Sequence, residues 1–259
     1  MQDPLLHYEV HGTHGPFILL VHGLLSSRAQ WLPNLGALSQ FSRPVVTELF
    51  GHGRSPSPED PECYTPDNYV LEFERIRNKI GVERWFLCGQ SLGAALTLRY
   101  ALRHPDHIIA QVFTNSRSAF SEPASPEAMS VLADRLEKEG YKVIDAFPLH
   151  PSQSRHIKNE IKDALVEDVK LIHLRGFSNT ILYTAPKTSL SQAINKNQVP
   201  ALLVAGRFDK QFTPLIEIAE KNMPKLEVLI LDGGHAINIQ EPDKFNEAVR
   251  NFILRFDER

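Results

Sequence analysis

The sequence has few cysteines, Cys63 and Cys88 among 259 residues. Cys88 lies in an apolar run that is typical of a core strand, so we expect no structural disulfide and predict a reducing compartment, the cytoplasm. No apolar run approaches the roughly 20 residues of a membrane span. The first ten residues contain Asp3, His7 and Glu9 where a secretory signal would have an apolar core. We therefore expect no membrane partner.

The sequence also lacks an excess of charge of one sign. Its 28 Lys and Arg residues nearly balance 31 Asp and Glu residues, for a net charge of -3. Because nucleic-acid binding leaves a basic surplus or a basic stripe, we expect no nucleic-acid partner. No Cys/His ligand spacing and no glycine-rich phosphate loop occurs, so we expect no metal and no organic cofactor. Hydrophobic residues make up 42% of the chain, which is typical of a globular domain.

Short apolar runs alternate with amphipathic stretches along most of the chain. The apolar runs are residues 17–21, 45–49, 85–88, 108–114, 201–205 and 226–231. Helical patterns lie at residues 69–80, 92–103, 214–222 and 242–256. Continuous apolar runs are typical of strands that are covered on both faces, and alternation with helices predicts a parallel sheet. The fold class is therefore α/β, with a mostly parallel, doubly wound sheet.

The alternation fails once, between residues 116 and 198. Apolar residues spaced by three or four predict an amphipathic helix there: Ile157, Ile161, Leu165, Val169 and Ile172. A second helix is expected at residues 126–139. We predict a core domain of residues 1–115 and 199–259, interrupted by a helical cap of residues 116–198.

The pentapeptide Gly89-Gln90-Ser91-Leu92-Gly93 directly follows one predicted strand and opens a predicted helix. A nucleophile at the tip of such a sharp turn crowds the positions two residues away, and glycine relieves that crowding. The helix N-terminus also directs unpaired amides to the site where an oxyanion would form. Ser91 is thus the candidate nucleophile. The alternative is a tight turn in which the serine caps the helix.

Two further strand ends supply a candidate base and acid. Asp209 follows the strand of residues 201–205, and His235 follows the strand of residues 226–231. Both therefore project from the carboxyl edge of the sheet, where open parallel sheets place their sites. A serine nucleophile needs a base, and the base needs an acid that fixes its tautomer. Asp209 could alternatively be a turn or helix-capping residue.

The segment His22-Gly23-Leu24 follows the first apolar strand. An oxyanion hole needs two backbone donors, one from the residue after the nucleophile and one from this loop. Leu92 and Leu24 occupy those positions. For His22 we favour a structural role that positions the loop.

The sequence resembles the α/β-hydrolase fold superfamily, in the branch that carries a serine nucleophile and a helical cap after the sixth strand, here residues 108–114. The resembling segments are His22-Gly23-Leu24 with Trp31 beyond, residues 49–55, the turn around Ser91, residues 206–209, and Gly234-His235 with Pro242 and Phe245. The order Ser91, Asp209, His235 is the order of that family. The chain departs from the family at Glu48, where Asp is usual, and at Gln240, where Glu is frequent. Its short N-terminus leaves seven strands or a frayed edge in place of eight.

The resemblance implies a small-molecule substrate and hydrolysis of a carboxylic ester through an acyl-enzyme. A serine nucleophile is incompatible with the dehalogenases and epoxide hydrolases of the fold, which use aspartate. The alternatives are a carbon-carbon bond hydrolase or pyruvate-eliminating lyase acting on an anionic substrate, and a small-ligand binder without turnover. Candidate pocket residues are Leu25, Arg117, Phe147, Phe177 and Leu182, of which Arg117 could pair with a substrate carboxylate. Each could instead be cap core or surface. We expect a monomer or homodimer.

Overall fold

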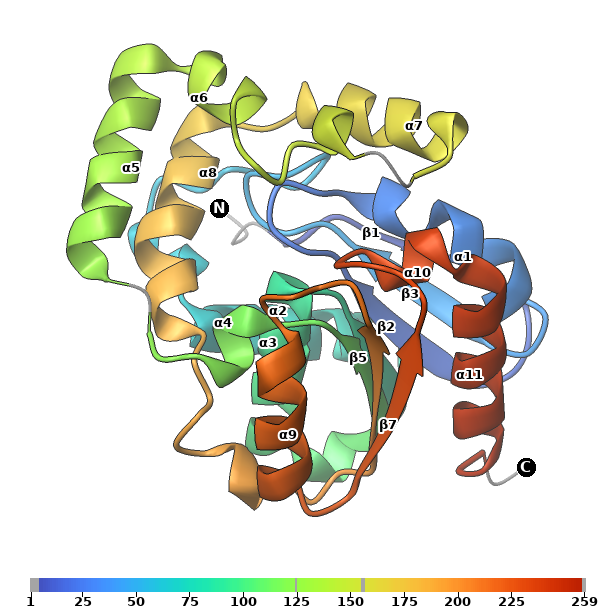
Figure 1. The fold of residues 1–259 in the computed structure, drawn as a ribbon. Helices are drawn as coiled ribbons and strands as arrows, with labels where there is room; N and C mark the ends of the chain where they lie inside the picture. Colours follow the sequence, from blue (N-terminus) through green and yellow to red (C-terminus); the bar gives the residue numbers. More distant parts are fainter. Residues whose placement is uncertain (1–4, 124, 155–156, 258–259) are drawn as a thin grey trace.

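A computed structural model describes residues 5–123, 125–154 and 157–257, and a seven-stranded sheet lies at its centre (Figure 1). The strands are β1 Tyr8–Val10, β2 Phe17–Val21, β3 Arg43–Thr47, β4 Trp85–Gly89, β5 Ile108–Thr114, β6 Ala201–Gly206 and β7 Leu226–Leu231. Their order across the sheet is β1-β3-β2-β4-β5-β6-β7. Strand β1 pairs with β3 in the antiparallel direction, and every other pairing is parallel. The predicted α/β class with a mostly parallel sheet is confirmed.

Helices cover both faces of the sheet. Helices α2 (Pro66–Lys79), α3 (Leu92–Arg103) and α9 (Thr213–Asn222) pack on one face, and α1 (Leu32–Leu38) and α11 (Pro242–Leu254) pack on the other. Successive strand side chains point to opposite faces. In β2, for example, Leu19 belongs to the same buried cluster as Tyr69 and Tyr100, whereas Leu20 belongs to the cluster of Trp31 and Phe245. This alternation explains why the strands read as continuous apolar runs.

Most element boundaries match the sequence patterns, and the differences have local causes. Helix α2 begins three residues before the predicted start, because the Thr65 hydroxyl accepts a hydrogen bond from Asn68 N–H and Pro66 takes the first helical position. Strand β3 ends at Thr47, two residues early, since Glu48 leaves the sheet and accepts bonds in the following loop. Strand β1 is too short to give a sequence pattern, and it supplies the antiparallel edge of a sheet of seven strands.

The chain between β5 and β6 is helical, with no strand among its described residues (Figure 1). Its α-helices are α4 Arg117–Phe120, α5 Pro126–Glu139, α6 Tyr141–Asp145, α7 Asn159–Val169 and α8 Leu174–Asn179. Helix α5 has the predicted bounds, and α7 carries most of the predicted amphipathic spacing. Buried side chains of α5, α6 and α8 form a small core with Leu25 of the sheet domain.

Two contacts fix this helical segment to the sheet domain. The backbones of Gly51 and Gly176 touch, because a Cβ built on Gly176 would lie 2.6 Å from Gly51 Cα. Beside them, His173 N–H donates to Gly51 O at 3.0 Å. At the other end, the Ser27 hydroxyl donates to the Asp168 carboxylate at 2.7 Å. The segment therefore contacts the loop that follows β2 and the loop that follows β3.

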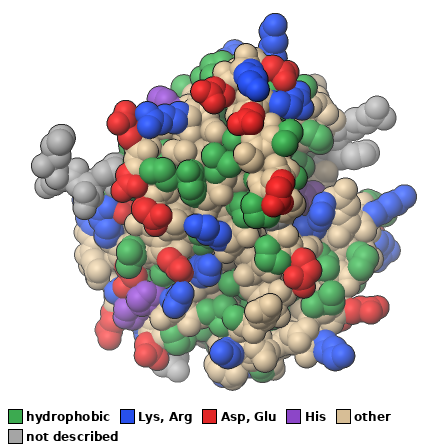
Figure 2. Space-filling view, turned by 90° about the vertical axis from the view of Figure 1, so that its left-hand side faces the viewer, with side chains coloured by type: hydrophobic (Ala, Val, Ile, Leu, Met, Phe, Trp, Pro, Cys, Tyr) green, Lys and Arg blue, Asp and Glu red, His purple; other side chains and the backbone are tan. Residues whose placement is uncertain are grey.

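The surface mixes both signs of charge. Figure 2 shows acidic and basic side chains interspersed with apolar ones over one face of the molecule. This distribution agrees with the near balance of charge in the sequence. Among the described residues, no helix is both long and apolar enough to cross a membrane.

Candidate active site

Ser91 stands at the sharp turn from β4 into α3. Its φ is 53°, a left-handed conformation that is uncommon for a residue with a side chain. The flanking glycines permit the turn: a Cβ on Gly89 would lie 2.6 Å from Ala94 Cα, and one on Gly93 would lie 2.5 Å from His22 O. The Ser91 side chain makes no capping bond to the helix. Its hydroxyl therefore does not serve the capping role that was the alternative interpretation.

The structure brings Ser91, His235 and Asp209 together in one chain of hydrogen bonds. His235 Nε2 lies 2.9 Å from Ser91 Oγ, and His235 Nδ1 lies 2.7 Å from Asp209 Oδ2. A carboxylate can only accept, so Nδ1 carries a proton and Nε2 of the neutral ring is free to accept from the serine. The three residues come from the ends of β4, β6 and β7, which lie at the same edge of the sheet.

Asp209 is held as a carboxylate by several donors. Burial alone would raise its pKa, but hydrogen bonds from His235 and Asn115 lower the pKa below the ordinary value. Asn115 Nδ2 donates to Asp209 Oδ2 at 2.9 Å, and Phe212 N–H donates to Oδ1 at 3.3 Å. Asn115 is fully buried, and its own Oδ1 accepts from Gly206 N–H at 3.0 Å. Asn115 thus links the end of β5 to the Asp209 loop.

The backbone N–H groups of Leu24 and Leu92 are the proposed donors of the oxyanion hole. Among the described residues, none accepts a hydrogen bond from the backbone N–H of Leu24 or Leu92. Gly23 lets the two loops approach, since a Cβ there would lie 3.0 Å from Ser91 Cβ. The adjacent Leu25 has a positive φ of 57°, so this loop holds a second unusual backbone conformation beside Ser91.

His22 positions this loop, as we predicted. Its Nδ1 donates to Gly23 O at 2.7 Å, and its Nε2 accepts from Leu49 N–H at 3.0 Å. Burial lowers the pKa of His22 to about 4, so the ring is neutral at pH 7. Both ring nitrogens are bonded to backbone, and neither is directed to Ser91.

The two departures from the family pattern are also structural. The buried Glu48 carboxylate accepts from Arg28 N–H and Arg54 N–H, which ties together the loops after β2 and β3. Gln240 Oε1 accepts from Gly234 N–H, one residue before His235. Its amide oxygen can accept this bond as a carboxylate would.

A cavity of about 230 Å³ opens onto Ser91 and His235. Its walls come from the loop after β2, from residues 148–151, 153, 154, 157 and 165 of the helical segment, and from the region after β7. The lining side chains are amides, hydroxyls, imidazoles, prolines and aliphatic groups. They are Leu24, Leu25, Ser26, Gln30, Gln90, Ser91, Pro148, Leu149, His150, Pro151, Gln153, Ser154, Ile157, Leu165, His235, Ala236, Ile239 and Gln240.

Of the five predicted pocket residues, only Leu25 lines this cavity; Arg117, Phe147, Phe177 and Leu182 do not. Arg117 is exposed, and its guanidinium donates to Gln211 Oε1 at 2.6 Å. Phe147 and Phe177 pack edge to face inside the core of the helical segment, where Phe177 is fully buried. Leu182 is partly buried in the short π-helix Thr180–Thr184. The sequence indicated the apolar or cationic character of these side chains but not whether they face Ser91.

Two sets of site residues had no predicted role. Asn115 follows β5 directly, so it shares the strand-end position that identified Ser91 and Asp209. The stretch of residues 148–154 lines the cavity without helical periodicity, because it runs through a loop and the 3-10 turn Pro151–Gln153. Its prolines signal only a turn.

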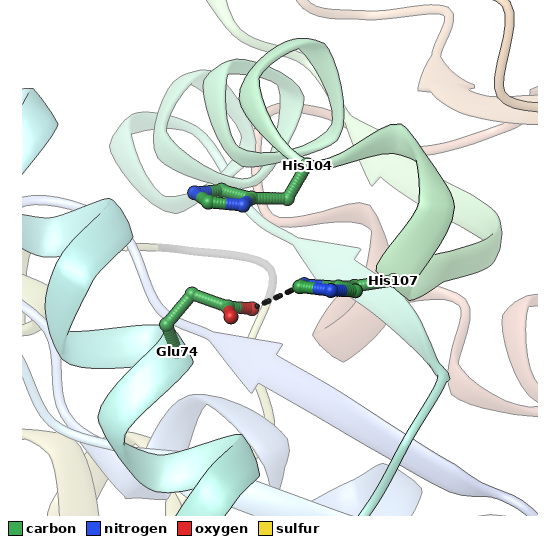
Figure 3. Close-up of side chains that lie close together, drawn as sticks. All are labelled: Glu74, His104 and His107. Carbon is green, nitrogen blue, oxygen red and sulfur yellow. Dashed lines mark hydrogen bonds and ion pairs between the residues drawn. The ribbon is translucent and has the colours of Figure 1, made fainter.

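One group outside the cavity has donors that could hold a metal. Figure 3 shows Glu74 of α2 directed at His107, with the His104 ring stacked on His107. Their candidate ligand atoms lie within 4.8 Å of one another. Burial would raise the pKa of Glu74, but hydrogen bonds from Arg77, Tyr100 and His107 lower it to about 2.

A metal at this cluster would have to displace the hydrogen-bond donors that already bind the Glu74 carboxylate. Arg77 Nη2 lies 2.8 Å from Glu74 Oε2, and the Tyr100 hydroxyl and His107 both bond to Oε1. The cluster therefore forms an ion-pair network in the structure. His107 immediately precedes β5, so this network lies at the amino edge of the sheet, opposite to Ser91.

A mostly parallel sheet that carries serine, histidine and aspartate at its carboxyl edge defines a hydrolase of the α/β class. A family model described as the alpha/beta hydrolase fold matches residues 16–242. The chain belongs to the α/β-hydrolase fold family.

The alignments with several named proteins extend over almost the whole chain. A protein of Agrobacterium fabrum named carbamate hydrolase RutD is 32% identical over 98% of this chain and 100% of its own length. The enol-lactonase of Burkholderia xenovorans superimposes with a TM-score of 0.82 at 23% identity, over 96% of each chain. MenH of S. aureus superimposes with a TM-score of 0.83 at 18% identity, covering 96% of this chain and 98% of its own. The two structures share the fold, and the chain is a hydrolase of this fold.

Proposed function

We propose that this protein is a serine hydrolase that cleaves a carboxylic ester of a small molecule through an acyl-enzyme. The observation that supports it most directly is the pair of hydrogen bonds that join Ser91 to His235 and His235 to Asp209. Such a chain converts a weak hydroxyl nucleophile into an effective one.

In the proposed mechanism, His235 Nε2 takes the proton of Ser91 as the oxygen attacks the ester carbon. The N–H groups of Leu24 and Leu92 stabilise the oxyanion of the tetrahedral intermediate. His235 then gives the proton to the departing alcohol, which leaves an acyl group on Ser91. A water molecule, deprotonated by the same imidazole, attacks the acyl carbon and releases the acid. Asp209 stabilises the imidazolium in both half-reactions.

The helical segment between β5 and β6 acts as the cap in this proposal. It contributes the lining residues 148–151, 153, 154, 157 and 165, so the substrate would be enclosed between the cap and the sheet edge. Enclosure excludes water and strengthens the hydrogen bonds made to the reacting groups. The cap is also the part of the site that selects the substrate.

A carbamate is a second candidate substrate class, favoured by the 32% identical relative that bears the name carbamate hydrolase. The same serine attack applies, because a carbamate presents an acyl carbon between two heteroatoms. The anionic diketo-acid substrates lose their proposed anchor, since Arg117 bonds to Gln211 on the surface.

A purified-protein screen tests the proposal. Neutral short-chain aryl esters, aryl carbamates and vinylogous diketo acids would be assayed with the wild-type protein and with Ser91→Ala. We expect ester turnover that falls on the order of a millionfold in the variant, while circular dichroism shows the fold retained. Hydrolysis that persists in Ser91→Ala would contradict the role of Ser91. Turnover confined to the diketo acids would replace the ester assignment with carbon-carbon cleavage.

A further inference from the structure

His150 lies in the cavity wall that the helical segment contributes. It is 7% exposed, and it lines the same cavity as Ser91 and His235. It stands directly before the 3-10 turn Pro151–Gln153 and caps that turn with its side chain. The cap is thus the source of a second imidazole in the cavity, separate from the imidazole that bonds to Ser91.

The hydrogen bonds around His150 fix its tautomer. Ser152 N–H donates to His150 Nδ1 at 3.2 Å. A backbone N–H can only donate, so Nδ1 must be the acceptor and the ring proton must be on Nε2. The Ser152 hydroxyl lies 2.7 Å from the same Nδ1 and can donate to it as well. His150 is therefore a neutral ring with an N–H donor at Nε2.

The Nε2–H group makes no hydrogen bond to the part of the chain that the structure describes. Among the described residues, none accepts a hydrogen bond from His150 Nε2. The amide side chains that line the cavity are, in contrast, each tied to the protein. These bonds join Gln30 to Asn238, Gln90 to His235 O, Gln153 to Phe147 O and Gln240 to Gly234 N–H. An N–H donor that has no partner among these residues is available to a ligand or to water in the cavity.

We propose that His150 Nε2–H is a hydrogen-bond-donor subsite that takes a neutral acceptor oxygen of the substrate, such as a ketone or ether oxygen outside the scissile ester. A neutral imidazole surrounded by amides, hydroxyls and aliphatic groups offers no full positive charge. Burying a carboxylate against it would cost more free energy than the bond returns. The inference rests on the proposed function, and it narrows the substrate class to esters that carry an additional acceptor oxygen outside the ester group.

The first experiment tests the tautomer and the contact without turnover. Long-range proton-nitrogen NMR spectra of labelled Ser91→Ala protein would report both ring nitrogens of His150, assigned by loss of the signals in Ser91→Ala/His150→Asn. We expect a protonated Nε2 that shifts on addition of ethyl 4-oxopentanoate, and no shift with ethyl 4-methylpentanoate, in which a methyl group replaces the ketone oxygen. A proton on Nδ1, or equal shifts with both esters, would overturn the proposal.

The second experiment measures selectivity. For the same two ethyl esters, and for 2-methoxyethyl against butyl acetate, kcat/KM would be compared in wild type, His150→Asn and the control His14→Asn. Asparagine can still cap the turn through its side-chain oxygen but lacks the reach of Nε2. His14 is exposed and bonds to Gln40 O before β2, far from the cavity edge.

We expect His150→Asn to lower the ratio of oxygen-bearing to alkyl ester by about tenfold in at least one pair, the usual effect of one hydrogen bond. His14→Asn should leave both ratios unchanged. Unchanged ratios in His150→Asn, with Ser91-dependent hydrolysis present, would overturn the subsite alone. A lack of Ser91-dependent hydrolysis of every ester would instead refute the proposed function, while the NMR result still decides the subsite.

Discussion

Replacement of Asn115 by leucine tests how the acid of the site is positioned. Asn115 is fully buried and makes two bonds, one to the Asp209 carboxylate at 2.9 Å and one from Gly206 N–H at 3.0 Å. Leucine keeps a similar branched shape but can neither donate nor accept. The substitution therefore removes a bond to a charged group and leaves a buried backbone N–H without its partner.

Both losses can be given a magnitude. A hydrogen bond to a charged group contributes roughly 1.5–3 kcal/mol, and an unsatisfied buried N–H costs roughly 1–3 kcal/mol. Because the two bonds share one side chain, we expect the free energy of unfolding to fall by about 3 kcal/mol. Asp209 keeps His235 as a partner, so part of its orientation survives. We expect kcat to fall by on the order of 10- to 100-fold, because part of the free energy of the lost hydrogen bond no longer stabilises the transition state.

Urea denaturation and steady-state kinetics on an aryl ester would measure the two effects. Thr114→Val is the matched control, since the neighbouring Thr114 hydroxyl is buried without a hydrogen-bond partner among the described residues. Valine has the same shape, so we expect stability and kcat close to those of the wild type. If Asn115→Leu kept the wild-type kcat, the reasoning that Asn115 positions Asp209 would be refuted.

Three further outcomes are expected. Asp209→Asn should lower kcat roughly ten-thousandfold, and a loss below tenfold in stopped-flow or steady-state assays would move the acid elsewhere. Gly93→Ala should destabilise the protein by several kcal/mol or prevent folding, because the new Cβ would lie 2.5 Å from His22 O; an unchanged urea midpoint would contradict this. His22 and His52 have pKa values lowered by burial to about 4 and about 3, so between pH 6.5 and 4 the unfolded chain binds more protons than the folded one. Stability should therefore fall as the pH falls through that window, by about 1.4 kcal/mol per pH unit for each imidazole, and a flat urea midpoint across it would exclude buried neutral histidines.

The sheet and the Ser91, His235 and Asp209 positions were predictable because each depends on local sequence. A strand followed by a turn places its last residues at the sheet edge, whatever the rest of the chain does. Glycine at positions 89 and 93 indicates in the sequence itself that the backbone approaches closely around this turn. Hence the sequence sufficed to place three distant side chains at one edge.

The cavity wall was not predictable in the same way. Phe147 and Phe177 have the apolar character of pocket residues, but they pack against each other, and that choice depends on how α6 and α8 cross. His150 lies in a stretch whose prolines conceal any periodicity. Asn115 had the right position but no partner that the sequence could reveal, since Gly206 and Asp209 are about ninety residues away.

The backbone contact between Gly51 and Gly176 restricts how substrate range can be re-engineered in this protein. A chimaera that imports the helices of a relative must import a glycine at the position of 176, or a side chain will collide with the loop after β3. Segments grafted between residues 121 and 170 avoid that collision, but they must retain an acceptor for the Ser27 hydroxyl and the apolar side chains that pack with Leu25. Recombination libraries whose junctions lie at residues 121 and 170 should yield a larger share of folded variants than libraries whose junctions lie at the ends of β5 and β6.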